Sequence, residues 1–246
     1  MDSGYYAACT ALMSRAQALD TIASNLANTS TAGYRGRHNV FQSALAQAGT
    51  MQLSAINQAV NSFGVLGGTR LDSAQGNLER TGNEYDLAIE GPGFFVVQTS
   101  AGKAYTRNGG FRISTDHQLV TASGDPVLGE NGPVMILGAA LSISADGTIS
   151  TGGALAGKLQ LVEFPAGSEM ENLGQSYYSA PSGIAQQGSH SQIRQGMLEG
   201  SNVSPVSSVV DLITVQREAG MMQRVLALFH SDLNKTAAQE LSRVNP

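Results

Sequence analysis

Several residue types that mark common protein classes are scarce in this chain of 246 residues. It has no tryptophan and one cysteine, Cys9, which excludes an internal disulfide and fits a buried thiol on a helix. Charged residues make up 13% of the chain, about half of the roughly 25% that is usual in soluble domains. Only 14 residues are lysine or arginine and the net charge is -5, so no basic stripe is available for nucleic acid.

Long apolar runs are also missing. No segment approaches the roughly 18 apolar residues that are needed to span a bilayer, so direct membrane insertion is not expected. The amino terminus lacks a basic segment followed by a continuous apolar one, which predicts that no signal peptide is cleaved.

Catalytic and metal-binding motifs are absent as well. The four histidines are too scattered for a short zinc-binding spacing, and no G-x-S-x-G, H-E-x-x-H or phosphate-binding loop pattern occurs. We therefore expect no cofactor, no metal and no catalytic residue. A pair of aspartates suited to glycoside hydrolysis stays open as the enzymatic alternative, because distances between carboxylates cannot be read from the sequence.

Both ends of the chain predict helices with one apolar stripe. Near the amino terminus Tyr5, Leu12, Leu19 and Leu26 recur every seven residues, and Cys9, Ala16, Ile22 and Ala23 fill the adjoining positions. The helix is expected over residues 5 to 28, where turn-forming residues begin. An ordinary amphipathic core helix is the simpler reading of this pattern.

The carboxy-terminal helix is expected to start at Ser204-Pro205, a favourable capping pair. Its apolar residues then alternate spacings of three and four, which is the seam of a coiled coil and calls for a helical partner. Two helices that touch along one seam are marginal alone, so we expect them to fold fully only among neighbouring subunits. The seam consists of Leu212, Val215, Ala219, Met222, Leu226, Phe229 and Leu233.

The middle of the chain reads as a β domain. Short apolar runs such as 86–89, 94–97, 119–121 and 159–162 alternate with turn residues, and Asp146-Gly147 between Leu141 and Ile149 indicates a hairpin. The segment 36–80 has a helix-like piece at 40–48 followed by glycines, and is expected to be a connector. The fold class is therefore α+β, with paired terminal helices and a central, mostly antiparallel β domain.

Two basic sites need an interpretation. The cluster Tyr34-Arg35-Gly36-Arg37-His38 follows a helix, where positive charge complements the helix dipole; an anion-binding site is the alternative. Arg107 is expected where a strand enters a turn, with an anchoring role at an interface as the second possibility.

The turn after the first helix carries Ala23-Ser24-Asn25-Leu26-Ala27-Asn28 followed by Thr31-Ala32-Gly33-Tyr34, which closely resembles the amino-terminal signature of flagellar rod and hook proteins. Tyr34 stands where phenylalanine is commoner. The likeness continues, in the order of the family, through 81–83, 86–91, 93–95, 105–109, 119–121 and 198–203. It is greatest for subunits of the proximal rod segment, with those of the distal segment next, and weakest after Gln216.

The resemblance implies an uncleaved subunit that leaves the cell through the flagellar type III export apparatus and assembles with copies of itself and other rod subunits. The product would be a helical tube in the basal body that crosses the periplasm and transmits torque. Expected domains are an inner-rod helix at 1–35, a connector at 36–80, a β domain at 81–203 and a second inner-rod helix at 204–246. The inner layer would be held by Leu12, Leu19, Ile22, Leu26, Leu212, Val215, Met222, Leu226, Phe229 and Leu233, and the turn by Asn25, Asn28, Thr31, Gly33 and Tyr34.

A different class remains compatible with the apolar patterns alone. A secreted β-rich binding module on a trimeric helical stalk would show the same terminal seams and the same central strands.

Overall fold

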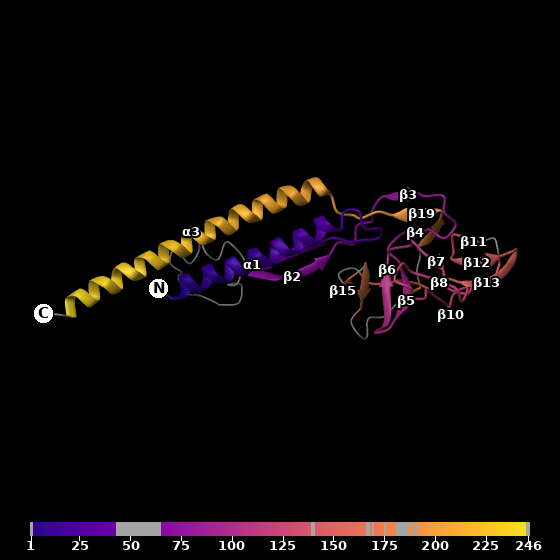
Figure 1. Ribbon diagram of the computed structural model, residues 1–246, viewed down its shortest axis with the longest axis horizontal. Coiled ribbons are helices and arrows are strands. Elements are labelled where there is room, and N and C mark those ends of the chain that lie inside the picture. Colours follow the sequence, from indigo (N-terminus) through magenta and orange to yellow (C-terminus); the bar gives the residue numbers. More distant parts are fainter. Residues whose placement is uncertain are drawn as a thin grey trace. The chain divides into compact units, whose positions relative to one another are not determined.

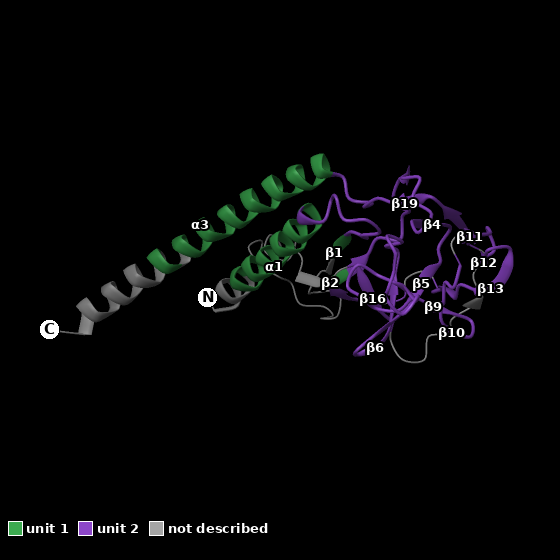
Figure 2. Cartoon of the chain, turned by 45° about the vertical axis from the view of Figure 1, so that its right-hand side comes forward, with its two compact units in different colours: residues 1–26, 37–69, 205–246 green, residues 27–36, 70–204 purple. Residues whose placement is uncertain are grey.

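The structure is a computed structural model of the whole chain, and it describes residues 2–42, 65–138, 141–165, 168, 170–174, 176–180, 187–188 and 191–244. These residues form two compact units. The first comprises residues 1–26, 37–69 and 205–246, and the second comprises residues 27–36 and 70–204 (Figure 2). The chain therefore passes between the units four times.

The first unit contains the two terminal helices, α1 (Asp2–Ala27) and α3 (Pro205–Val244). They run in opposite directions alongside each other (Figure 1), and Arg15 Nε lies 2.9 Å from a carboxylate oxygen of Glu218. Pro205 opens α3 as expected of a residue that needs no backbone hydrogen bond at the first helical position. None of the helices in the described part of the chain has an apolar stretch that would reach across a bilayer.

The buried face of α1 differs from the predicted stripe. Ala8, Ala11, Ala18 and Ile22 are buried, whereas Leu12, Leu19 and Leu26 are only half-buried. Ala16 and Ala23, which were expected beside the stripe, are exposed. The reason is that small alanines, which a pattern of large apolar residues does not count, define the face that packs.

The second unit is the β domain, and it is mostly antiparallel, as predicted. Its largest sheet has six strands in the order β15-β16-β6-β5-β14-β17, and a three-stranded sheet has the order β11-β12-β13. The remaining strands of this unit pair as β18-β4, β19-β3, β7-β8 and β10-β9, whereas β1 and most of β2 belong to the first unit, where they pair with each other.

The strand bounds follow in chain order. They are β1 (Arg37–Gln42), β2 (Val65–Leu71), β3 (Leu78–Arg80), β4 (Leu87–Glu90), β5 (Phe94–Thr99), β6 (Gly102–Thr106), β7 (Arg112–Ile113), β8 (Leu119–Val120), β9 (Leu128–Gly129), β10 (Gly132–Pro133), β11 (Leu141–Ile143), β12 (Thr148–Thr151), β13 (Ala154–Lys158), β14 (Leu161–Glu163), β15 (Glu171–Gly174), β16 (Tyr177–Ser179), β17 (Gln187–Gly188), β18 (Gln192–Gln195) and β19 (Met197–Glu199).

Strand β5 lies between two hydrophobic cores. Phe95 and Val97 belong to the larger core, and Phe94 and Val96 belong to the smaller one on the other face. Successive residues of a strand point to opposite sides of the sheet, so an unbroken apolar run indicates burial on both sides. The predicted hairpin at Asp146-Gly147 also forms, because β11 and β12 pair across it and Gly147 takes a φ of 89°.

The helix-like reading of residues 40–48 is wrong at its start. Residues 40–42 are the end of β1, and the following six residues lie outside the described part of the chain. The strand pairing of β1 with β2 overrides the local helical pattern.

Candidate functional site

The residues of the predicted turn after α1 are held by their side-chain amides and by one glycine. The amide of Asn25 makes two hydrogen bonds with the backbone of Arg37: its Nδ2 donates to the carbonyl at 2.8 Å, and its Oδ1 accepts from the N–H at 3.0 Å. Further along, the hydroxyl of Thr31 donates to Oδ1 of Asn28 at 3.1 Å. Polar side chains that bond to nearby backbone groups in this way are what fixes a turn.

Gly33 occupies a position that no other residue fits. Its φ is +66°, and its N–H donates to the carbonyl of Glu199 at 2.7 Å. A Cβ atom at this position would lie 2.2 Å from the backbone nitrogen of Asn108. The turn is therefore pressed against the backbone that follows β6, and only hydrogen can stand between them.

A buried ionic cluster lies next to this turn in the second unit. Glu199 places one carboxylate oxygen 2.8 Å from Nη2 of Arg35 and the other 3.1 Å from Nη1 of Arg107. The side chains of all three residues are 1–2% exposed. The backbone N–H of Gly76 also donates to Glu199, at 2.9 Å. One carboxylate therefore joins the segment that follows α1, the residue that follows β6 and the end of β19.

The two guanidinium groups have further partners that offset the loss of water. Arg107 donates to the carbonyls of Gly91 at 2.5 Å and Ile89 at 3.4 Å, and its Cζ lies 4.9 Å from the centre of the Phe94 ring. Arg35 donates from Nη1 to the carbonyl of Ser73 at 3.1 Å. Burial of charge is unfavourable unless such partners are present. The Nε atoms of Arg35 and Arg107 are the exception, since they are buried without a hydrogen-bond partner among the described residues.

Burial lowers the pKa of both arginines. Burial, together with the positive charge of Arg35, lowers the pKa of Arg107 to about 10, while Glu199 acts in the opposite direction. Burial also lowers the pKa of Arg35, again against the attraction of Glu199. Both groups remain protonated at neutral pH, so the cluster is ionic.

Asn202 completes the arrangement. Its Oδ1 accepts from the N–H of Gly36 at 2.7 Å, and its Nδ2 donates to the carbonyls of Ala74 at 2.9 Å and Asp72 at 3.3 Å. The N–H of Asp72 donates in turn to the carbonyl of Gly36 at 2.8 Å. One amide thus connects three separate stretches of chain within the second unit.

We call the set Arg35, Arg107, Glu199 and Asn202 the clasp. It ties the segment that follows α1 in the sequence to the segment that precedes α3. Tyr178 of β16 adds a hydroxyl that accepts from the N–H of Arg35 at 2.9 Å. The clasp can hold the backbone of the segment after α1 and of the segment before α3, because its side chains bond to both segments.

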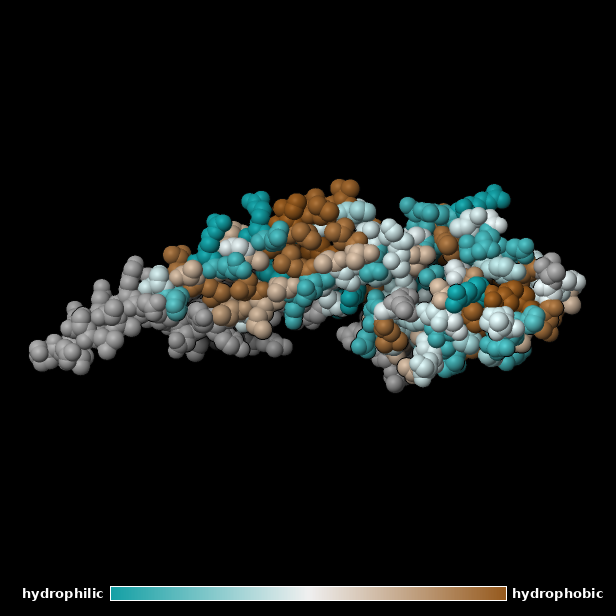
Figure 3. All heavy atoms as spheres, in the orientation of Figure 1, coloured by the Kyte–Doolittle hydropathy of each residue, from teal (hydrophilic) through white to brown (hydrophobic). Residues whose placement is uncertain are grey.

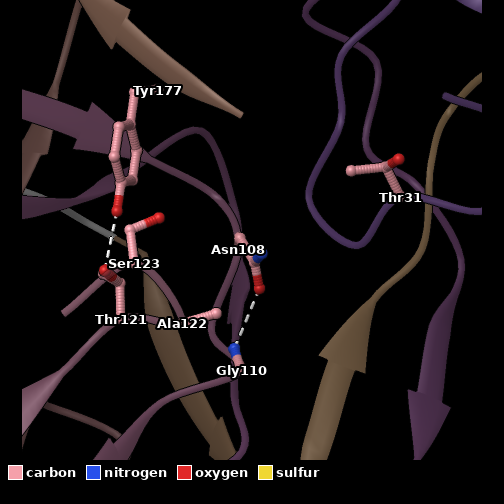
Figure 4. Close-up of a pocket in the computed structure, with 7 residues that line it drawn as sticks. All are labelled: Thr31, Asn108, Gly110, Thr121, Ala122, Ser123 and Tyr177. Atoms are coloured by element: carbon pink, nitrogen blue, oxygen red, sulfur yellow. Dashed lines mark hydrogen bonds between the residues drawn. The ribbon is translucent and has the colours of Figure 1, made fainter. Parts of the chain in front are cut away.

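A pocket of about 290 Å³ lies nearby, and Thr31 of the turn is one of the residues that line it (Figure 4). The hydroxyl of Tyr177 lies 2.7 Å from that of Thr121 and 2.8 Å from a carboxylate oxygen of Asp125. Figure 4 shows Thr31 standing across the opening from Asn108. The hydroxyls of Tyr177 and Thr121 are therefore bonded to each other at the wall of the pocket.

The structure places the predicted assembly residues on the two helices. Ile22 and Met222 are buried, and Phe229 and Leu233 have side chains outside the described set. The half-buried ones are Leu12, Leu19, Leu26, Leu212, Val215 and Leu226. Their role in assembly stays a prediction.

The sequence interpretation missed the clasp. Arg35 was assigned to the dipole of the preceding helix, but it is buried against Glu199 instead. Arg107 does follow β6 as expected, and its partner is this same carboxylate. Glu199 and Asn202 were quoted only as part of a motif, since an acid and an amide near the carboxy-terminal helix carry no local signal for a partner at the other end of the chain.

Three family models match the chain in separate regions. The model described as "Flagella basal body rod protein" matches residues 6–35, "Flagellar hook protein FlgE/F/G D1 domain" matches residues 88–151, and "Flagellar basal body rod FlgEFG protein C-terminal" matches residues 194–229. Each region supplies part of the clasp: Arg35 comes from the first, Arg107 from the second, and Glu199 and Asn202 from the third.

Similar curated proteins extend over the whole chain. The flagellar basal-body rod protein FlgF of Caulobacter vibrioides is 32% identical over 250 residues, which cover 100% of both chains. FlgF of Salmonella typhimurium is 31% identical over 98% of both chains, and FlgG of Buchnera aphidicola subsp. Schizaphis graminum is 33% identical over 81% of this chain and 85% of its own. The chain therefore belongs to the flagellar basal-body rod protein family.

Within that family it is of the FlgF type, with FlgG proteins the next most similar, as the resemblance in sequence predicts. It is a structural subunit of the flagellar rod.

Proposed function

We propose that the chain is an axial subunit of the proximal rod, which assembles through α1 and α3 with copies of itself and other rod subunits into a torque-transmitting tube. Its place in the basal body and its export through the type III apparatus belong to this proposal. The terminal helices would pair as a coiled coil in the inner layer of the tube, and the β domain would form the outer wall.

The clasp is the observation that carries the proposal. A torque-bearing subunit needs the two segments that border its helices to stay joined under load, and within the second unit these segments are joined through buried, multiply bonded groups. Exposed ion pairs would separate easily, because each contributes at most about 1 kcal/mol to the free energy of unfolding. Buried charges resist separation, since removing one partner of a buried pair costs about 3 to 5 kcal/mol.

The exposed apolar side chains of α3 also support assembly. Val206, Val210 and Leu228 are 75%, 57% and 65% exposed in the single chain. A surface of this kind favours contact with other helices over contact with water. The proposal treats it as surface that neighbouring subunits cover.

The test is removal of the gene followed by electron microscopy of the basal bodies. Cells without the chain should not swim and should have incomplete rods, and a tagged copy should restore both and should copurify with the rod. Normal swimming with complete rods in the deletion strain would contradict the proposal. A copy carrying Ala156→Ser, an exposed change within β13, is the matched control and should restore both.

A further inference from the structure

Helix α3 carries two stripes on opposite faces, and both are rich in apolar residues. The inner stripe includes Ser208, Ala219 and Met222, which are buried. The outer stripe is exposed and gives the hydrophobic surface over the first turns of α3 in Figure 3. Its members recur at helical spacing on one face: Val206, Val210, Ile213, Arg217, Met221, Arg224 and Leu228.

Helix α1 also has an outer stripe, of a different character. Met13, Ala16, Asp20 and Ala23 are exposed and are spaced by three and four residues, so they share one face. Except for Met13, these side chains are short. A face of this kind allows a second helix to approach closely, provided that the second helix supplies the large side chains.

The charges on the two outer stripes are opposite. Asp20 is acidic, and Arg217 and Arg224 are basic; all three are exposed. Within the described ranges no ion pair involves any of them, whereas Arg15 and Glu218 on the inner side are paired at 2.9 Å. The charges that the single chain leaves unmatched lie on the faces that point away from its own partner helix.

The spacing of both stripes agrees with one antiparallel register. If Asp20 is set opposite Arg217, Ala16 comes opposite Met221, and Ala23 comes level with Thr214, one residue from Ile213. These large side chains of α3 then lie against alanines of α1, which is how ridges fit into grooves when helices pack. The register differs by about one helical turn from that of the Arg15–Glu218 pair within the chain.

We propose that the outer stripe of α3 binds the outer stripe of α1 in a second copy of the chain, with Asp20 paired to Arg217. The contact joins unlike surfaces, so it does not close on itself and each copy offers a free stripe to the next. This inference rests on the proposed function, because the assembly supplies neighbours whose helices point in the same direction.

The test crosslinks two differently tagged copies in one cell. Both carry Cys9→Ser, which removes the only cysteine of the chain; one also carries Ala16→Cys and the other Met221→Cys. Rods are purified and treated with a short bis-maleimide, whose reach suits helix axes about 8 to 10 Å apart. We expect a product at twice the subunit mass that contains both tags. Gln223→Cys in place of Met221→Cys is the control, since Gln223 is also exposed but is turned by about 160° from Met221 around the helix, and should give no such product.

The outcomes separate this inference from the proposed function. The contact is overturned, and the rod assignment stays intact, if the substituted subunits are present in the rod but give no two-tag product. The same conclusion follows if they crosslink to a different protein. Their absence from the rod, together with absence of the unsubstituted tagged chain, would overturn both. Asp20→Arg and Arg217→Asp should each reduce swimming, and the double variant should restore it; loss in the double variant as severe as in either single one would also count against the pair.

Discussion

Arg35 and Glu199 form an ion pair of 2.8 Å in which both side chains are almost fully buried, although they come from opposite ends of the sequence. Arg107 shares the same carboxylate. This relationship makes the amino-terminal turn and the carboxy-terminal strand depend on each other, so the β domain is complete only when both are in place.

Replacing Glu199 with glutamine should lower the free energy of unfolding by about 3 to 5 kcal/mol, because two buried guanidinium groups lose their counter-charge. Glu90→Gln is the matched control, since Glu90 pairs with Arg194 on the surface, with the two side chains about half exposed. Its effect should stay within about 1 kcal/mol. Urea unfolding of the purified proteins gives both values, and equal losses would show that burial of the cluster carries no special weight.

Gly33→Ala should be far more harmful than Gly82→Ala, although both glycines have a positive φ of 66° and 76°. Around Gly82 nothing lies within 4 Å of an added Cβ, so the cost is backbone strain alone, about 1 to 2 kcal/mol. At Gly33 the Cβ meets the Asn108 backbone, and we expect a loss above about 4 kcal/mol or failure to fold. Thermal unfolding compares the two, and similar melting temperatures would mean that the turn is not pressed against residue 108.

Asn202→Ala should loosen the backbone at Gly36, because the alanine can neither accept from that N–H nor donate to the carbonyls of Asp72 and Ala74. The unfolding free energy should fall by about 1 to 3 kcal/mol. Hydrogen exchange should be faster at the Gly36 amide than in a control with Asn77→Ala, whose side chain is exposed. Unchanged protection of Gly36 would contradict the role given to Asn202.

Tyr177 should make stability depend on pH in the alkaline range. Burial raises the pKa of Tyr177 above its usual value of 10.0. Between the unfolded and the folded pKa the unfolded chain has lost this proton and the folded chain keeps it, so stability is full below pH 10 and decreases as the pH rises further. Tyr177→Phe should show a shallower decrease in urea unfolding between pH 9 and 11. Parallel curves for the two proteins would rule out this contribution.

How far the sequence predicts the structure depends on the range of the interaction. The helix from Pro205, the double-sided strand at Phe94 to Val97 and the hairpin at Gly147 follow from local patterns of apolar and turn residues, and all form. The packed face of α1 does not follow, because Ala8, Ala11 and Ala18 form it and alanine is equally at home on a surface.

The clasp was beyond prediction for a different reason. A basic residue after a helix fits the helix dipole equally well, and nothing near Glu199 in the sequence points to Arg35 or Arg107. Only the fold brings the three charges together. Arg35, Arg107 and Glu199 do lie in three separately matched regions of the chain, each as a charged residue within a short family motif.

The most direct measurement of the central claim compares two neighbouring positions on α3 in rods purified from cells. Met222 is 3% exposed and Gln223 is exposed, so Met222→Asp places a carboxylate within the predicted inner layer while Gln223→Asp leaves it outside. If the terminal helices build the rod, Met222→Asp subunits should be missing from it and the cells should not swim, while the β domain stays folded by circular dichroism and Gln223→Asp behaves as the unsubstituted chain. Met222→Asp subunits found in complete rods of normally swimming cells would contradict the account.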